Sequence, residues 1–278
     1  MNYPNDYIYK YVEEEISKQN LYDKKVLFVF GDSWTNNRYV KNPKKHWCYL
    51  LKQKLDYDLV VNISNYYDSN YEIFDCVKKT LSDKDYPMNQ QSYLDKLKEF
   101  KVVIDWSTPM RDSTSVAEMY SPWNAATIPN LDSKKPNTKL WLDYVDRWFR
   151  IEMYSYDTQK RILFLQEFFN HNKIDWYMFM GFTPLVEKQF HNTKYDLRKW
   201  IDKERFLFLY GFPNNMQDYL ITTLDKKFKE DIDINEMQFE NNRLKYFGSH
   251  SNDVFTCDGH PDTKGLELMS DMIYRSIK

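Results

Sequence analysis

The segment that decides the fold spans residues 25–35 and reads Lys-Val-Leu-Phe-Val-Phe-Gly-Asp-Ser-Trp-Thr. Its apolar run, Val26–Phe30, predicts a short strand covered on both faces, as strands of a parallel sheet are. The run stops at a Gly-Asp pair, so Ser33 stands where the strand should end. In open α/β sheets, ligands bind outside the carboxyl ends of the strands, where the strand order reverses. Ser33 is therefore expected where chemistry takes place.

Similar apolar runs recur along the chain, and helix-like stretches separate them. This alternation predicts an α/β fold, with a parallel sheet wrapped by helices. The candidate strands are Val26–Phe30, Asp58–Ile63, Val102–Trp106, Ile174–Met180 and Phe206–Tyr210. The candidate helices are Trp47–Leu55, Tyr71–Leu81, Gln91–Glu99, Tyr156–His171, Leu185–Lys203 and Asp262–Ile277. Since the chain has 278 residues and no flexible linker, we expect one domain over residues 1–278.

Residues 109–148 interrupt the alternation between the third strand and the next helix. This insertion carries several Trp and Pro residues, Trp123 among them, between polar residues. Insertions on the carboxyl side of a parallel sheet often shape a cleft or a lid. A substrate-binding lid and an aromatic cap packed on the domain fit the composition equally well.

A serine hydroxyl becomes a nucleophile only when a base takes its proton, so Ser33 needs a histidine nearby in space. Of the 5 histidines, His260 differs from the rest because it shares a loop with an acid, directly before the last candidate helix. A carboxylate beside an imidazole holds its tautomer and stabilises the imidazolium. The sequence therefore predicts Ser33 as nucleophile, His260 as general base and Asp258 as the acid that orients it.

The N-terminal Gly31-Asp32-Ser33 and the C-terminal Asp258-Gly259-His260-Pro261 together resemble the first and last sequence blocks of the SGNH/GDSL hydrolases, a family of esterases and lipases. Softer similarities over residues 60–73 and 103–111 resemble phage-borne members. The resemblance implies a three-layer α/β/α flavodoxin-like sandwich around a mostly parallel sheet of five strands. It also implies an esterase that forms an acyl-enzyme and needs no metal and no cofactor.

Members of this family complete an oxyanion hole with a Gly after the second strand and an Asn after the third, and this chain has neither block in its usual form. Carried over by position, the resemblance implies a hole built from the Ser33 amide with Asp68, Asn70 and Ser107. Loss of one oxyanion donor lowers turnover by roughly 10²–10³. Altered blocks therefore weaken an enzyme more readily than they abolish it.

Two more departures concern carboxylates. The family's acid commonly lies three residues before its histidine, where this chain has Cys257, so Asp258 takes the role from the next position. Asp105 would oppose a developing oxyanion if it faced one, because like charges repel. We expect Asp105 to point elsewhere or to pair with Arg111.

The expected substrate is a small-molecule or carbohydrate ester, with O-acetylated carbohydrate as one option, since Trp and Tyr faces pack on sugar rings. Trp34, Trp106 and Trp123 are the candidate substrate-binding residues. The net charge of -2 attracts neither nucleic acid nor an anionic membrane. The chain start shows no signal segment, and its 3 cysteines form no Cys-x-x-Cys pair. We expect a cytoplasmic protein, and virion association stays open.

Two alternatives to the enzyme remain. A non-catalytic binding module or virion protein that keeps the hydrolase fold would explain the altered oxyanion blocks, because a fold does not fix a function. The presence of Ser33, Asp258 and His260 together favours the enzyme. A metal site of Cys257, Asp258, His260 and His250 fits no closed zinc pattern and ranks last.

Overall fold

The computed structural model describes residues 20–36, 42–64, 69–82, 93–109, 150–224 and 260–278. In this part of the chain the strands form one parallel sheet in the order β2-β1-β3-β4-β5. The strands are β1 (Lys25–Gly31), β2 (Leu59–Ser64), β3 (Glu99–Trp106), β4 (Asp175–Met180) and β5 (Phe206–Leu207). The predicted flavodoxin-like order of a doubly wound sheet is thereby confirmed.

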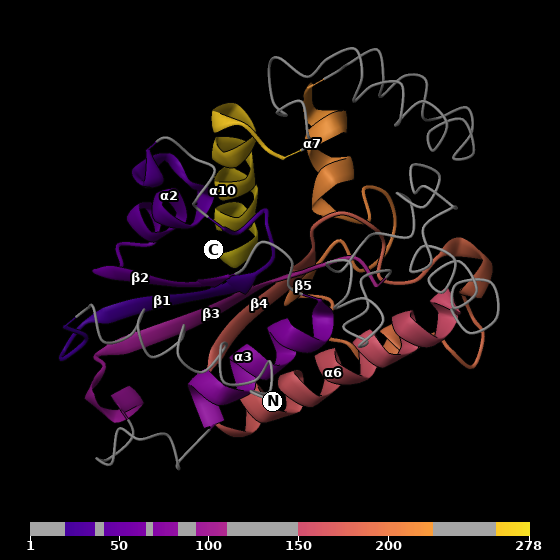
Figure 1. Ribbon diagram of the computed structural model, residues 1–278, viewed down its shortest axis with the longest axis horizontal. Coiled ribbons are helices and arrows are strands. Elements are labelled where there is room, and N and C mark those ends of the chain that lie inside the picture. The colour runs from indigo at the N-terminus through magenta and orange to yellow at the C-terminus, as the bar shows by residue number, and fades with distance from the viewer. Residues whose placement is uncertain (1–19, 37–41, 65–68, 83–92, 110–149, 225–259) are drawn as a thin grey trace, which may run out of the picture.

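Helices cover both faces of the sheet, which gives the predicted three layers (Figure 1). One face carries α2 (Trp47–Lys54), α7 (Met216–Leu224) and α10 (Thr263–Ile277), and the other carries α3 (Asn70–Ser82) and α6 (Ile151–His171). Each face has its own cluster of buried apolar side chains, because alternate residues of β1 point to opposite sides. Phe28 belongs to the α3/α6 side, whereas Leu27 and Val29 belong to the α2/α10 side.

Strand β1 occupies the position where the strand order reverses. In register, Gly31 lies beside Ser64 of β2, and Phe30 lies beside Ile104 of β3. The chain thus leaves β1 toward one side for β2 and returns on the other side for β3. The carboxyl end of β1 therefore lies at the switch point of the sheet, beside which doubly wound folds bind ligands.

Helix α10 begins at Thr263, three residues after His260. The Asp262 carboxylate caps it, with Oδ1 accepting from the backbone amides of Lys264 (2.9 Å) and Gly265 (3.1 Å). Its buried apolar side chains, Leu266, Met269 and Ile273, pack on the α2 side of the sheet. The start of α10 is therefore fixed both by its cap and by its core contacts.

Two predicted helices are wrong. Instead of a helix over Gln91–Glu99, the described residues form a short 3₁₀ turn at Tyr93–Lys96, and Glu99 already begins β3. Instead of a helix over Leu185–Lys203, two 3₁₀ turns form at Lys188–Phe190 and Arg198–Trp200. In the second segment, polar side chains bond to nearby backbone amides, which competes with helix formation.

The insertion over residues 109–148 lies outside the described residues except for Pro109, so its role as lid or cap stays a prediction. Among the helices that the structure describes, none is long and apolar enough to cross a membrane.

Candidate active site

A tight turn follows β1 and presents Ser33. The Asp32 carboxylate accepts a hydrogen bond from Trp34 N (3.0 Å), and the Asp32 carbonyl accepts from Thr35 N (3.1 Å) and Asn36 N (3.0 Å). Ser33 itself is 4% exposed. Within the described ranges, neither its hydroxyl nor its backbone N–H forms a hydrogen bond. The turn thus holds Ser33 in place without engaging its polar groups.

Close packing beneath the turn requires a glycine at position 31. A Cβ on Gly31 would lie 2.4 Å from Thr35 Oγ1 and 2.9 Å from Asp105 Cβ. Thr35 Oγ1 donates to Asp105 Oδ2 at 2.8 Å, and Asp105 is fully buried. The predicted partner Arg111 lies outside the described residues, and the Thr35 hydroxyl was not foreseen as a partner. Gly31 thus allows the turn to fold back onto β3.

Hydrogen bonds between the turn and β2 anchor the far end of the turn. Asn62 Nδ2 donates to Thr35 O at 2.7 Å, and Asn36 Nδ2 donates to Ser64 O at 3.2 Å. Ser64 Oγ in turn donates to Asn62 Oδ1 at 2.6 Å. Buried hydrogen bonds of this kind hold a backbone segment in one conformation.

His260, the predicted base, is half-buried and lies two residues before the Asp262 cap of α10. No hydrogen bond joins Ser33 to His260 among the described residues. Asp258 lies outside those residues, so the assignment of the triad stays a prediction. Cys257 and His250 also lie outside them, and the alternative metal site is equally untested.

Asn70 stands at the start of α3 because Ser69 and Glu72 form a capping box there. Ser69 N donates to Glu72 Oε2 (2.6 Å) and Glu72 N donates to Ser69 Oγ (3.4 Å). From this position Asn70 Nδ2 donates to Ser107 O (2.9 Å) and Thr158 Oγ1 (3.2 Å). A flipped amide would set its oxygen against the Ser107 carbonyl, so this orientation is favoured.

These bonds correct one prediction and sharpen another. Both amide hydrogens of Asn70 are engaged, so its side chain is not an oxyanion donor; it fixes the backbone of Ser107 instead. The Ser107 hydroxyl is fully buried and has no partner within the described part of the chain. A buried donor without an acceptor is costly unless a ligand engages it. Asp68, the other candidate, lies outside the described residues.

Comparison with known proteins finds similar structures, whereas no family model and no curated protein matches the chain. A structure from Desulfitobacterium hafniense DCB-2, assigned to a lipolytic G-D-S-L family, is 10% identical, with a TM-score of 0.31 over 90% of this chain and 98% of that one. A G-D-S-L family member from Veillonella parvula DSM 2008 is 11% identical, with a TM-score of 0.36 over 90% and 97%. The chain is similar to solved G-D-S-L proteins.

The two described Trp candidates for substrate binding are core residues. Trp34 is 1% exposed and packs edge-on against Phe182, with ring centroids 4.5 Å apart. Trp106 is fully buried, and its Nε1 donates to Met178 Sδ at 3.3 Å. Because protein encloses both rings, we assign them to packing, which corrects the prediction. Trp123 lies outside the described residues.

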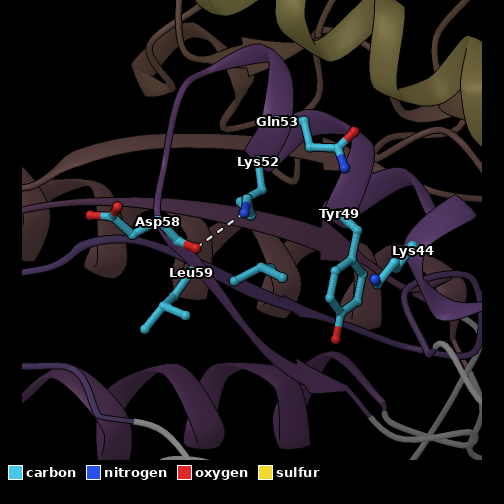
Figure 2. A pocket seen from close by; sticks show the side chains of 7 residues that line it. Lys44, Tyr49, Lys52, Gln53, Asp58 and Leu59 are labelled. Carbon is cyan, nitrogen blue, oxygen red and sulfur yellow. Dashed lines mark hydrogen bonds between the residues drawn. The ribbon is translucent and has the colours of Figure 1, made fainter.

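A hollow of about 430 Å³ lies elsewhere, between α2 and the start of β2 (Figure 2). Its rim includes Lys52, whose ammonium group donates to the carbonyl of Asp58 at 3.1 Å. Leu59 in its wall pairs with Val26 at the amino end of β1, whereas Ser33 follows the carboxyl end. This hollow therefore lies at the amino ends of β1 and β2, away from Ser33, and we do not assign it to the candidate active site.

Proposed function

We propose that the protein is a serine ester hydrolase of the GDSL type with Ser33 as its nucleophile. The observation that carries the proposal is the turn after β1. It fixes its other residues by hydrogen bonds and leaves the Ser33 hydroxyl and N–H without partners among the described residues. A rigid support that leaves the serine hydroxyl available to a base and to a substrate suits covalent catalysis.

The proposed reaction has two halves. Ser33 Oγ attacks the ester carbonyl carbon while His260, oriented by Asp258, accepts the serine proton. The tetrahedral intermediate collapses, the alcohol leaves with the proton from His260, and an acyl-enzyme remains. A water molecule, deprotonated by His260, then attacks the acyl carbon, and Ser33 regains its proton as the acid departs.

Two donors are proposed for the oxyanion. The Ser33 backbone N–H and the buried Ser107 hydroxyl each lack an acceptor among the described residues, so each can bind the developing negative charge. Asn70 supports this arrangement by holding Ser107 O at 2.9 Å. The two donors follow β1 and β3, which are hydrogen-bonded neighbours.

The proposed substrates are esters, and O-acetylated carbohydrates are the preferred class. The support for this class is the Trp- and Pro-bearing insertion over residues 109–148, whose composition suits sugar rings. The test compares acetate release from an acetylated xylan with that from a small aryl acetate. Aryl acetate hydrolysis without xylan deacetylation would remove the carbohydrate part of the proposal and keep the esterase.

Hydrolysis of a short-chain aryl ester tests the esterase itself. Wild type and the control Ser276→Ala, at the far end of α10, are expected to turn over at the same rate. Ser33→Ala and His260→Ala are expected to lose activity by at least about 10³-fold. Equal rates for wild type and Ser33→Ala would overturn the proposal and favour the non-catalytic binding or virion module.

A further inference from the structure

Three buried polar side chains that touch no reacting atom converge on the turn behind Ser33. His46 is 1% exposed, Cys48 is fully buried and Asn62 is 9% exposed. His46 and Cys48 come from the start of α2, and Asn62 comes from β2. Two of the three bind backbone carbonyls of the turn: His46 Nε2 lies 3.2 Å from Trp34 O, and Asn62 Nδ2 lies 2.7 Å from Thr35 O.

The chemistry of the partners fixes where the hydrogens lie on His46. A carbonyl only accepts, so His46 Nε2 must carry the proton that binds Trp34 O. Burial lowers the pKa of His46 to about 3, against a smaller opposing effect of the Trp34 bond, so the ring is neutral near pH 7. Nδ1 is therefore an acceptor. This imidazole has no free nitrogen to act as a base toward Ser33.

Cys48 must then donate. Its Sγ lies 2.9 Å from His46 Nδ1, and burial raises the pKa of the Cys48 thiol, so the sulfur keeps its proton near pH 7. The S–H group points to Nδ1, and the sulfur in turn accepts from Asn62 Nδ2 at 3.4 Å. The second hydrogen of the Asn62 amide serves Thr35 O. The three side chains thus form a series of hydrogen bonds in which each donor is fixed. Asn62 donates to Cys48, Cys48 donates to His46, and His46 donates to Trp34 O.

We propose that His46, Cys48 and Asn62 are positioning residues for Ser33, with Cys48 as the link that joins the other two. The inference rests on the proposed esterase function. The side chains of His46 and Asn62 fix the carbonyl oxygens of Trp34 and Thr35. The backbone amides of the same turn bind Asp32. The peptide units that follow the nucleophile are therefore fixed at both ends. A displacement of about 1 Å at a reacting group lowers turnover on the order of 10²-fold.

Substitution of Cys48 tests the link. Cys48→Ala removes the donor to His46 and the acceptor for Asn62, and kcat is expected to fall roughly 10- to 100-fold with little change in KM. Cys48→Ser keeps a group that both donates and accepts, and is expected to recover most of the loss. Cys76→Ala is the matched control, since Cys76 is a buried cysteine in the cluster on the opposite face. It is expected to lower stability and leave kcat unchanged.

The outcomes separate this inference from the proposed function. If wild type hydrolyses esters but Cys48→Ala keeps the kcat of Cys76→Ala, the positioning role is overturned while the esterase stands. If wild type hydrolyses no ester and forms no fluorophosphonate adduct, the proposed function fails.

Nitrogen-15 NMR of His46 adds a readout that needs no substrate. We expect a neutral ring that is protonated at Nε2. Because its pKa of about 3 lies well below this range, the signals should stay unchanged from about pH 5 to 9. Protonation at Nδ1 would contradict the proposed hydrogen bonds, in which Cys48 donates to His46 and His46 donates to Trp34 O.

Discussion

Two segments that follow strands of the same sheet use their polar side chains in opposite ways. The turn after β1 binds its neighbours through backbone and side-chain groups and leaves the Ser33 hydroxyl without a partner among the described residues. The segment after β4 instead engages its charges with one another. Asp196 and Arg198 form a two-bond pair, with Arg198 Nε at 3.0 Å and Nη2 at 2.9 Å from the carboxylate oxygens.

The Asp196 carboxylate also accepts from the backbone amides of Asn192 (3.0 Å) and Arg198 (3.1 Å). Together with Tyr210, whose ring lies 5.2 Å from the guanidinium carbon, this pair lines a hollow of about 450 Å³. Its charges shape the segment and are not free to react. Chemistry at this sheet is therefore expected where the fold holds a polar group in place without satisfying it.

Gly31→Ala breaks the turn itself and is expected to lower stability and turnover together. The new Cβ would meet Thr35 Oγ1 at 2.4 Å, and that hydroxyl is already bound to Asp105. We expect a loss of about 1–3 kcal/mol in the free energy of unfolding and at least a tenfold fall in turnover. Urea denaturation and ester hydrolysis measure the two effects.

Gly211→Ala is the matched control for that change. A Cβ at Gly211 meets nothing within 4 Å, and its φ of +81° leaves backbone strain as the cost. We expect about 1 kcal/mol of destabilisation and unchanged turnover. If the two alanine variants lost the same turnover, the turn after β1 would have no special role.

Ser107→Ala sharpens the comparison at a single hydroxyl. Turnover is expected to fall roughly 10²–10³-fold because an oxyanion donor is lost. Stability is expected to stay constant, since the hydroxyl has no partner among the described residues. Ser155→Ala is the control, because the Ser155 hydroxyl is already engaged as a donor to Leu185 O and an acceptor from Gln159 Nε2; it is expected to lower stability and keep turnover. A variant of Ser107 that lost stability but kept its turnover would contradict the assignment.

The smallest effect on turnover is expected from Asp196→Asn. The hydrogen bond from Arg198 lowers the pKa of Asp196 below its ordinary value of 3.8. The pair therefore stabilises the fold above that value, and this stabilisation is lost as the pH falls toward the pKa of the folded state. We expect the variant to be about 1–3 kcal/mol less stable at pH 7, with the gap narrowing below about pH 4. Urea unfolding across this range measures it; a constant gap, or lost turnover, would contradict the prediction.

The strands were the most predictable part of the fold. Buried parallel strands are continuous apolar runs, and such runs located all of β1 to β4 within a few residues. Strand β5 is shorter than predicted because Phe208 adopts a positive φ of 65°. Helix α7 was missed altogether. Its amino end is capped by Asn215, whose Oδ1 accepts from Asp218 N at 2.8 Å, and this signal lies within a segment rich in turn residues.

The site was only partly predictable. The position of Ser33 directly after the first strand was predictable, because it depends on a local pattern, whereas its role as nucleophile stays a prediction. The contacts of His46, Cys48 and Asn62 join separate elements, and hydrogen bonds between residues 14 positions apart leave no periodic signal in the sequence. The engagement of Asn70 could not be read from the sequence either, since Thr158 lies 88 residues away.

Covalent labelling with a fluorophosphonate, followed by peptide mass spectrometry, tests the central claim most directly. A nucleophilic serine held by the turn after β1 predicts one adduct, located on Ser33, that is absent in Ser33→Ala and present in Ser276→Ala. An unlabelled protein, or an adduct on any other residue, would contradict the account.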